Sequence, residues 1–340
     1  MNAEQLISTA QAMVAEGRGI LAIDESHGTI KKRFDLINLE SNEDNRRDYR
    51  QMLLTTEGLG EHISGAILFD ETLRQKTRDG VSLVEVMSKA GVLPGIKVDK
   101  GAHELAGHPG EKVTEGLDGL RERLAEYAEL GAKFAKWRAV ITIGEGMPTS
   151  ACVEANSHAL ARYAALCQEA GIVPMVEPEV LMDGSHTIEE CYEVTEATLR
   201  SLFTALYEQN VLLEGTILKA SMVVSGADCA EQAPVEEVAE ATVSCLRNAV
   251  PASVPGIVFL SGGQSDVLAT QHLNAMNQLG PHPWPLSFSY GRALQHAALM
   301  TWGEAPVEND KKAQAVLAHR AKCNGYAAMG RYSDEVESAK

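Results

Sequence analysis

Short apolar runs alternate with longer stretches of helical spacing along this chain of 340 residues. The runs are rich in Val, Ile and Leu, as buried strands are, and most neighbours are separated by apolar residues that recur every three or four positions. They occupy residues 19–24, 65–70, 93–99, 134–142, 171–180, 214–223, 256–263 and 285–294. Alternation favours a parallel sheet covered by helices, and eight strands is the number that closes a barrel. The pattern therefore predicts an α/β fold, a single (β/α)₈ TIM barrel.

A doubly wound open sheet is the competing architecture. A dinucleotide-binding sheet of that kind places G-x-G-x-x-G directly after its first strand, whereas "GILAID" is followed here by "ESHG". No linker or internal repeat divides the chain. We expect one domain over residues 1–340, with an N-terminal helix at about 1–17 and a short flexible C-terminal tail at about 331–340.

Charge and cysteine usage narrow the class of protein. The formal net charge is −17, which repels nucleic acid and anionic lipid, so phosphate recognition must come from a local basic pocket. The six cysteines form no C-x-x-C pair, and the N-terminus is typical of an amphipathic helix rather than a signal peptide. No apolar run approaches the roughly 20 residues of a membrane span. We expect a cytoplasmic protein that binds neither nucleic acid nor membranes.

Polar residues gather late in the apolar runs. They are Asp24, Asp70, Lys97, Asp99, Lys136, Arg138, Glu177, Glu179, Lys219, Ser261, Ser289 and Arg292. The active site of a TIM barrel forms at the carboxyl ends of its strands, so one pocket is expected to hold most of these side chains. Positions i and i+2 of a strand share a face, which pairs Lys136 with Arg138 and Glu177 with Glu179. Each pair alone is consistent with a structural ion pair, but their convergence favours a functional site.

Lys219 lies inside the apolar run "EGTILKASMV", where an unpaired charge is costly. A side chain that extends to solvent is one explanation, and catalysis is the other. Lysine ordinarily has a pKa of about 10.4, and only the neutral amine is a nucleophile. Desolvation and a second cation, Lys136 or Arg138, favour the neutral amine, which attacks a carbonyl to form a Schiff base. The protonated imine then withdraws electrons from the adjacent carbon–carbon bond.

Carboxylates and anion-binding groups complete this chemistry. We expect mutual repulsion to keep one of Glu177 and Glu179 partly protonated near neutral pH, with Asp24 as a third acid or base. In "FLSGGQS" the backbone N–H groups of Ser261, Gly262 and Gly263 are expected to form an anion nest, which Ser289, Gly291 and Arg292 extend. Loops after the last two strands of such barrels often bind phosphate. A second anion site is expected at Lys32, Arg33, Lys97 and Arg138.

The sequence supports a metal or redox site less well than the Schiff-base site. The closest histidines, His103 and His108, lack the i, i+4 spacing of a helical zinc site and lie in a predicted loop. His27, near Asp24, is expected to be a surface residue. The cysteines fall mainly in helical segments and are expected to be small core residues. The sequence predicts no metal ion and no cofactor.

The chain resembles class I fructose-1,6-bisphosphate aldolase over almost its whole length. The motifs are "GRGILAIDES", "GIKVDKG", "FAKWR", "GIVPMVEPEVL", "LEGTILK", "FLSGGQS" and "FSYGRALQ". This resemblance implies one (β/α)₈ barrel that reversibly cleaves fructose 1,6-bisphosphate to dihydroxyacetone phosphate and glyceraldehyde 3-phosphate without metal. Members are commonly homotetramers, so we expect a homo-oligomer.

The same resemblance implies a role for each matched residue. Lys219 matches the Schiff-base lysine and Glu177 the general acid/base, with Glu179, Lys136 and Asp24 as supporting groups. The phosphate of the ketone half would bind Ser261, Gly262, Gly263, Ser289, Gly291 and Arg292. The phosphate of the aldehyde half would bind Arg33, Lys97 and Arg138.

Two departures from the family pattern stand out. Ala220 and Ser221 replace the residues that usually follow the nucleophile, and we expect this to be tolerated because they point away from the reacting centre. Vertebrate members end in a longer tail with a terminal tyrosine that assists proton exchange, whereas the last tyrosine here is Tyr332. The preference between bisphosphate and monophosphate substrates is left open.

Two rival functions are weighed against this prediction. Another Schiff-base barrel enzyme, such as a transaldolase or a deoxyribose-phosphate aldolase, shares the lysine chemistry, but two separate cationic sites disfavour a substrate with one phosphate. The second rival is a scaffold protein, a barrel that has lost catalysis. The intact lysine and carboxylates disfavour this function.

Overall fold

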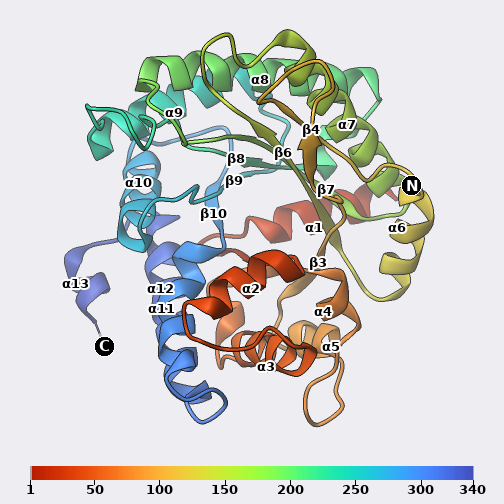
Figure 1. Cartoon of the computed structure of the whole chain (residues 1–340), viewed down its shortest axis with the longest axis vertical. Coiled ribbons are helices and arrows are strands. Elements are labelled where there is room, and N and C mark those ends of the chain that lie inside the picture. The colour runs from red at the N-terminus through yellow and green to blue at the C-terminus, as the bar shows by residue number, and fades with distance from the viewer. Residues whose placement is uncertain (1, 340) are drawn as a thin grey trace.

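The computed structural model describes residues 2–339, and a closed barrel of eight parallel strands lies at its centre (Figure 1). The strands are β1 (Gly19–Ile23), β2 (Ile63–Leu68), β3 (Leu93–Lys97), β6 (Phe134–Ile141), β7 (Val173–Val180), β8 (Ile217–Ala220), β9 (Ile257–Phe259) and β10 (Leu286–Tyr290). Around the barrel their order is β1-β10-β9-β8-β7-β6-β3-β2. Each strand overlaps one of the eight predicted runs. The predicted TIM barrel is confirmed, and the open sheet is excluded.

Helices cover the outside of the barrel. They are α1 (Ala3–Met13), α2 (His27–Asp35), α3 (Glu43–Leu54), α4 (Asp70–Arg74), α5 (Leu83–Lys89), α6 (Leu120–Glu129), α7 (Ser150–Glu169), α8 (Ile188–Glu208), α9 (Val235–Ala249), α10 (Asp266–Gln278), α11 (Arg292–Gly303), α12 (Asp310–Ala327) and α13 (Asp334–Ser338), with short 3₁₀ turns at Leu59–Glu61 and Leu213–Gly215. Local sequence sets their starts: Thr187 and Glu190 cap each other's backbone at the start of α8. In the described part of the chain, no helix has the length and apolar character needed to cross a bilayer.

Phe134 fills the lower interior of the barrel. Its ring is fully buried and occupies the space beside two glycines: a Cβ added to Gly95 would lie 2.2 Å from the ring, and one added to Gly65 would lie 2.9 Å from it. Below the strands, Leu6 and Met13 of α1 join the same apolar cluster. The amino-terminal end of the barrel is therefore closed, and only the carboxyl end is available for a site.

Two features outside the barrel differ from the pattern expected from sequence. Residues after β3 form a small antiparallel hairpin, β4 (Ala102–Glu104) and β5 (Lys112–Thr114), where we expected only a loop. The expected flexible tail contains helix α13, whose Glu337 pairs with Arg320 of α12 and accepts a hydrogen bond from Tyr332. These short elements are set by tertiary contacts, which local periodicity does not encode.

Candidate functional site

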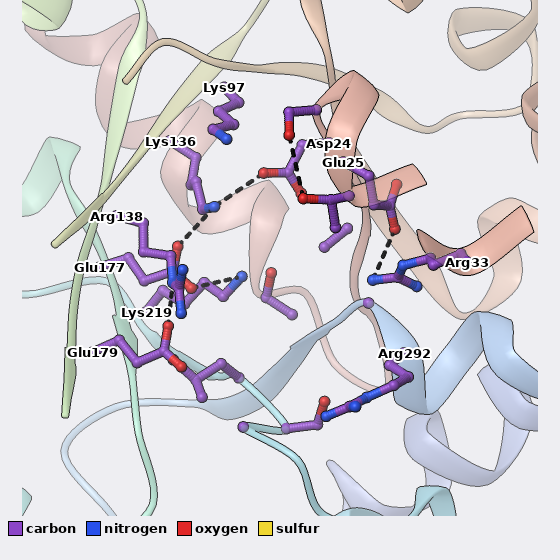
Figure 2. A pocket seen from close by; sticks show the side chains of 18 residues that line it. Asp24, Glu25, Arg33, Lys97, Lys136, Arg138, Glu177, Glu179, Lys219 and Arg292 are labelled. Atoms are coloured by element: carbon purple, nitrogen blue, oxygen red, sulfur yellow. Dashed lines mark hydrogen bonds and ion pairs between the residues drawn. The ribbon is translucent and has the colours of Figure 1, made fainter. Parts of the chain in front are cut away.

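A cavity of about 280 Å³ lies at the carboxyl end of the barrel (Figure 2). It is lined by Ala22, Asp24, Glu25, Ser26, Thr29, Arg33, Lys97, Lys136, Arg138, Glu177, Glu179, Lys219, Leu260, Ser261, Gly262, Ser289, Gly291 and Arg292. Of the residues given a role by the family resemblance, Gly263 is the one that is not in this lining. The fold thus brings residues from six barrel strands and two helices, α2 and α11, to one place.

Glu177 of β7 lies between two lysines at the centre of this cavity. Its Oε1 is 3.1 Å from Lys219 Nζ of β8, and its Oε2 is 3.0 Å from Lys136 Nζ of β6. All three side chains are almost completely buried, with Lys219 4% exposed. The lysine inside the apolar run therefore does not extend into bulk solvent, and the explanation of a solvent-directed side chain is wrong.

Asp24 supplies the second partner of Lys136. Its Oδ2 accepts a hydrogen bond of 2.9 Å from Lys136 Nζ, directly after β1 ends. Burial alone would lower the pKa of Lys136, but Asp24 and Glu177 together raise it, so this group is a fixed cation at neutral pH. Burial opposes ionisation of Asp24 as well, yet Lys136, Lys219 and Lys97 hold its pKa below the ordinary value.

The expected repulsion between the two glutamates is not what determines their protonation. Burial would raise the pKa of Glu177, but the positive charges of Lys136, Lys219 and Arg138 hold it below the ordinary value. Glu179 has its own cation, because Arg138 Nε donates to Glu179 Oε2. The expectation that one glutamate stays partly protonated is therefore wrong for Glu177, which is ionised at neutral pH because cations surround it.

Arg33 reaches the cavity from α2 and is held there by Glu25. The Arg33 Nη2 to Glu25 Oε1 distance is 3.0 Å, and the same oxygen accepts a hydrogen bond of 2.9 Å from Gln295 of α11. A Cβ added to Gly291 would lie 3.7 Å from Arg33 Nη2, so Arg33 stands beside the N-terminus of α11. In Figure 2, Arg33 and Arg292 lie across the cavity from Glu177 and Glu179.

Sequence reasoning missed Glu25, Ser26 and Thr29 as lining residues. A signal for two of them was present, because Ser26, Thr29 and Arg33 are spaced i, i+3 and i+7, which places them on one face of α2. Glu25 directly follows the predicted Asp24. Its role depends on contact with Arg33 and Gln295, and the second of these is 270 positions away in the chain.

The turn after β9 forms one wall of the cavity. Gly262 and Gly263 have positive φ angles of 63° and 156°, which glycine adopts at little cost. The N–H groups of Gly263 and Gln264 donate to the carbonyl of Ser261 at 2.7 and 3.0 Å. The N–H of Gly263 is therefore already hydrogen-bonded within the turn.

His272 of α10 holds this turn from behind. Its Nδ1–H donates to Gln264 Oε1 at 2.5 Å, and Gln264 Nε2 donates to Met222 Sδ, three residues after Lys219. Burial lowers the pKa of His272 to about 4, so the ring is neutral at physiological pH. This side chain links the turn of Ser261 and Gly262 to the chain that follows the buried lysine.

Ser289 and the N-terminus of α11 form the adjoining wall. The Ser289 side chain is 1% exposed, and its Oγ has no hydrogen-bond partner within residues 2–339. Helix α11 begins at Arg292, so its first N–H groups point toward the cavity beside Gly291. A free hydroxyl, a helix N-terminus and a guanidinium are groups that can bind an anion together.

Three residues expected near the site lie outside it. Lys32 is exposed on α2 and does not line the cavity. Asp70 pairs with Arg74 and Tyr127 in a neighbouring cavity. Asp99 lies behind the wall, where it accepts a hydrogen bond from the backbone N–H of Arg138 and lies 3.7 Å from Lys97 Nζ.

The two departures from the family motif also lie away from the cavity. Ser221 exchanges hydrogen bonds with the backbone of Val180, which ties the end of β8 to the end of β7. Ala220 is buried outside the lining, so both residues point away from Lys219 as expected. Tyr332, the last tyrosine, does not line the cavity either; its hydroxyl donates to Glu337.

Comparison with known proteins agrees with this geometry. Residues 5–340 match the family model "Fructose-bisphosphate aldolase class-I". The chain is 69% identical to "Probable fructose-bisphosphate aldolase class 1" of Xanthomonas axonopodis pv. citri, over 98% of this chain and 99% of that protein. It is 54% identical to "Fructose-bisphosphate aldolase 6, cytosolic" of Arabidopsis thaliana, over 98% of this chain and 93% of that protein.

A solved structure extends the comparison to three dimensions. The fructose-bisphosphate aldolase of Plasmodium falciparum, solved in complex with TRAP and a small-molecule inhibitor, superposes with a TM-score of 0.96 at 51% identity, covering 97% of this chain and 96% of that one. The chain therefore belongs to the class I fructose-bisphosphate aldolase family.

Proposed function

We propose that this protein reversibly cleaves fructose 1,6-bisphosphate to dihydroxyacetone phosphate and glyceraldehyde 3-phosphate through a Schiff base on Lys219. The observation that carries the proposal is the buried Lys219 amine 3.1 Å from Glu177, in a cavity with cationic side chains on opposite walls. Family membership supports the same activity.

Formation of the Schiff base requires a proton acceptor beside the lysine. Glu177, ionised because Lys136 and Arg138 stand near it, takes a proton from the Lys219 ammonium. The neutral amine then attacks the C2 carbonyl and gives a carbinolamine. While the nitrogen is neutral, one of the charges that keep the pKa of Glu177 low is gone, so Glu177 holds the proton that expels water. The products are an iminium ion, water and an ionised Glu177.

Cleavage uses the iminium ion as an electron sink. Glu177 removes the proton of the C4 hydroxyl, the C3–C4 bond breaks, and its electron pair moves toward the iminium nitrogen to form an enamine and the free aldehyde. Glu177 returns the proton to C3, and hydrolysis releases the ketone and regenerates the Lys219 ammonium. Lys136 and Asp24 hold the carboxylate and its charge in place throughout.

We propose that the two phosphates of the substrate bind to opposite walls of the cavity. We assign the ketone-half phosphate to Ser261, Gly262, Ser289, Gly291 and Arg292, because a free hydroxyl and a helix N-terminus meet there. Lys97 and Arg138 receive the phosphate of the aldehyde half. Arg33 is assigned with them by family resemblance, although it also stands beside Gly291.

We also propose a cellular location, an oligomeric state and a domain organisation for this protein. All six cysteines are free thiols, and the Arabidopsis relative is described as cytosolic, which supports a cytoplasmic location. We propose a homo-oligomer, a tetramer by family resemblance, in which residues 1–340 form one domain. Sedimentation equilibrium over a range of concentrations tests the assembly.

Trapping of the covalent intermediate tests the function. Borohydride reduction in the presence of dihydroxyacetone phosphate, followed by peptide mass mapping, is expected to place a single adduct on Lys219. Lys219→Met removes the adduct and the cleavage activity, whereas Lys133→Met, an exposed lysine at the start of β6, keeps both. An adduct on another residue, or cleavage abolished by a chelator, contradicts the proposal.

A substrate panel separates the rival functions. Fructose 1,6-bisphosphate is expected to be cleaved, whereas a transaldolase or a deoxyribose-phosphate aldolase would ignore it. A scaffold protein would give no adduct and no turnover with any of these sugars.

A further inference from the structure

We propose that His319, Cys323 and Glu337 form a binding site for one Zn²⁺ ion that joins helix α12 to the C-terminal helix α13. The site is separate from the catalytic cavity and from the proposed reaction, in which it has no part. Each residue offers one ligand atom, and the three atoms lie within 4.8 Å of one another.

The two ligands on α12 already have the separation that one ion requires. His319 and Cys323 are spaced i, i+4 on the helix, and His319 Nε2 lies 3.6 Å from Cys323 Sγ. For tetrahedral zinc, with Zn–S of about 2.3 Å and Zn–N of about 2.0–2.1 Å, the nitrogen and sulfur are roughly 3.6 Å apart. These two side chains therefore need little or no movement to share an ion.

Glu337 comes from the short helix α13 and is oriented by groups around it. Arg320 Nη1 donates to its two oxygens at 2.5 and 2.6 Å, and the Tyr332 hydroxyl donates to Oε2 at 2.7 Å. A metal-binding carboxylate is commonly held by such outer hydrogen bonds. The three ligand atoms lie within 4.8 Å of one another, so a small shift of the carboxylate can complete a tetrahedral arrangement. Arg320 is itself anchored to Thr270 Oγ1 at 2.7 Å.

The chemistry of the three donors selects the ion. A thiolate and an imidazole favour Zn²⁺ over Mg²⁺ or Ca²⁺, which prefer sets of oxygen ligands. On binding, the ion replaces the proton of the Cys323 thiol, which leaves to solvent, and the neutral imidazole donates a lone pair. One thiolate and one carboxylate then balance the charge of the ion, and the Arg320 guanidinium remains the partner of the carboxylate.

The surroundings leave a path to the site. Cys323 is fully buried, but His319 is half-buried and lines a cavity of about 430 Å³ together with Lys322 and Ala339. Of the three proposed ligands, His319 lines this cavity, so an ion can approach the site past its ring. Ligands from both helices would make the ion a cross-link that fastens residues 334–338 to the body of the protein.

Titration of the full-length, chelator-treated protein with Co²⁺ tests this site, because a thiolate bound to cobalt gives a charge-transfer absorption band. We expect one Co²⁺ per chain, displaced by one Zn²⁺. Cys323→Ser should abolish the band and His319→Gln should weaken Co²⁺ binding at least tenfold. Cys245→Ser, which removes a buried cysteine of α9, serves as the matched control and should leave the band intact.

Limited proteolysis provides a second measurement that does not depend on cobalt. Zn²⁺ should slow cleavage within residues 331–339 of the unmodified protein and have no such effect in His319→Gln, whose half-buried side chain is tolerant of replacement. The proposal would be overturned if the unmodified protein gave no charge-transfer band or if the band persisted in Cys323→Ser. It would also be overturned if Cys245→Ser lost the band to the same extent as Cys323→Ser. Retained aldolase activity in each variant shows that it is folded.

Discussion

The carboxylate of Glu177 lies 3.1 Å from the amine nitrogen of Lys219, and both side chains are almost completely buried. This contact joins the nucleophile to its proton acceptor without an intervening water. Since Lys136 approaches the other oxygen of the same carboxylate, the proton affinity of Glu177 depends on charges at both of its ends. The catalytic predictions below follow from this arrangement.

Replacing Lys136 by Ala should lower kcat by a factor of roughly 10²–10³, within the usual range for loss of acid–base function. The change removes the ammonium group that pairs with both Asp24 and Glu177, so each of these buried carboxylates loses that ion pair. Steady-state kinetics at neutral pH measures the effect. Lys133→Ala, an exposed lysine directly before β6, is the matched control and should retain normal turnover. Equal activity in both variants would contradict the role of Lys136.

Replacing Glu177 by Gln should slow formation of the Schiff base while leaving sugar phosphate binding nearly unchanged. The amide keeps the shape of the side chain but cannot accept the lysine proton. Single-turnover trapping with borohydride should show a rate of adduct formation lower by about 10²–10⁴. An equilibrium Kd within about threefold of the original value serves as the control, and undiminished trapping would show that another group takes the proton.

Replacing His272 by Ala should weaken the wall of the cavity that contains Ser261 and Gly262. The change removes the hydrogen bond that fixes Gln264 behind this turn. KM for fructose 1,6-bisphosphate should rise by a factor of about 3–10, the equivalent of one hydrogen bond, with kcat little altered. His272→Asn offers an N–H donor near the position of Nδ1 and should restore KM, which a general loss of stability would not allow.

The buried His272 also makes stability depend on pH. Burial lowers its pKa to about 4 from an ordinary value near 6.5, so between these values the unfolded chain binds a proton that the folded chain does not. The free energy of unfolding should therefore fall by up to about 1.4 kcal/mol per pH unit as the pH drops from 6.5 toward 4. Urea unfolding of the original protein and His272→Asn over this range isolates the contribution, because the variant lacks it.

Replacing Phe134 by Ala should destabilise the barrel by about 3–5 kcal/mol, as expected for an aromatic ring removed from a packed interior. The ring occupies the space beside Gly65 and Gly95, and neither glycine has a side chain that could fill the cavity left behind. Denaturant unfolding measures the loss. Leu36→Ala, an exposed residue after α2, should change stability by less than about 0.5 kcal/mol.

The barrel could be predicted from sequence because its strands are apolar runs that alternate with helical spacing, and polar residues gather late in these runs. Periodicity also placed Lys136 beside Arg138 and Glu177 beside Glu179, since two-residue spacing fixes the face of a strand. The same rule does not reveal partners across strands. The pairing of Glu177 with two lysines and of Glu179 with Arg138 became visible only from the register of the closed barrel.

Parts of the site depend on contacts between distant segments, and these escaped prediction. Glu25 is a site residue because Arg33 and Gln295 meet on its carboxylate. His272 acts through Gln264, and nothing in the helical pattern of α10 distinguishes it from a core residue. The hydrogen bond from Gly263 N–H to the Ser261 carbonyl also escaped prediction, because a Gly-Gly pair does not fix which carbonyl accepts from its N–H groups.

The closed lower end of the barrel constrains the order of events in the proposed reaction. Phe134 and helix α1 block passage through the floor, so both products depart by the opening that admitted the sugar. During turnover the three-carbon ketone fragment is covalently bound to Lys219 in this cavity, which has a single opening. The aldehyde must therefore leave first. In the direction of carbon–carbon bond synthesis the order is reversed: the ketone binds to Lys219 first, and the aldehyde enters second.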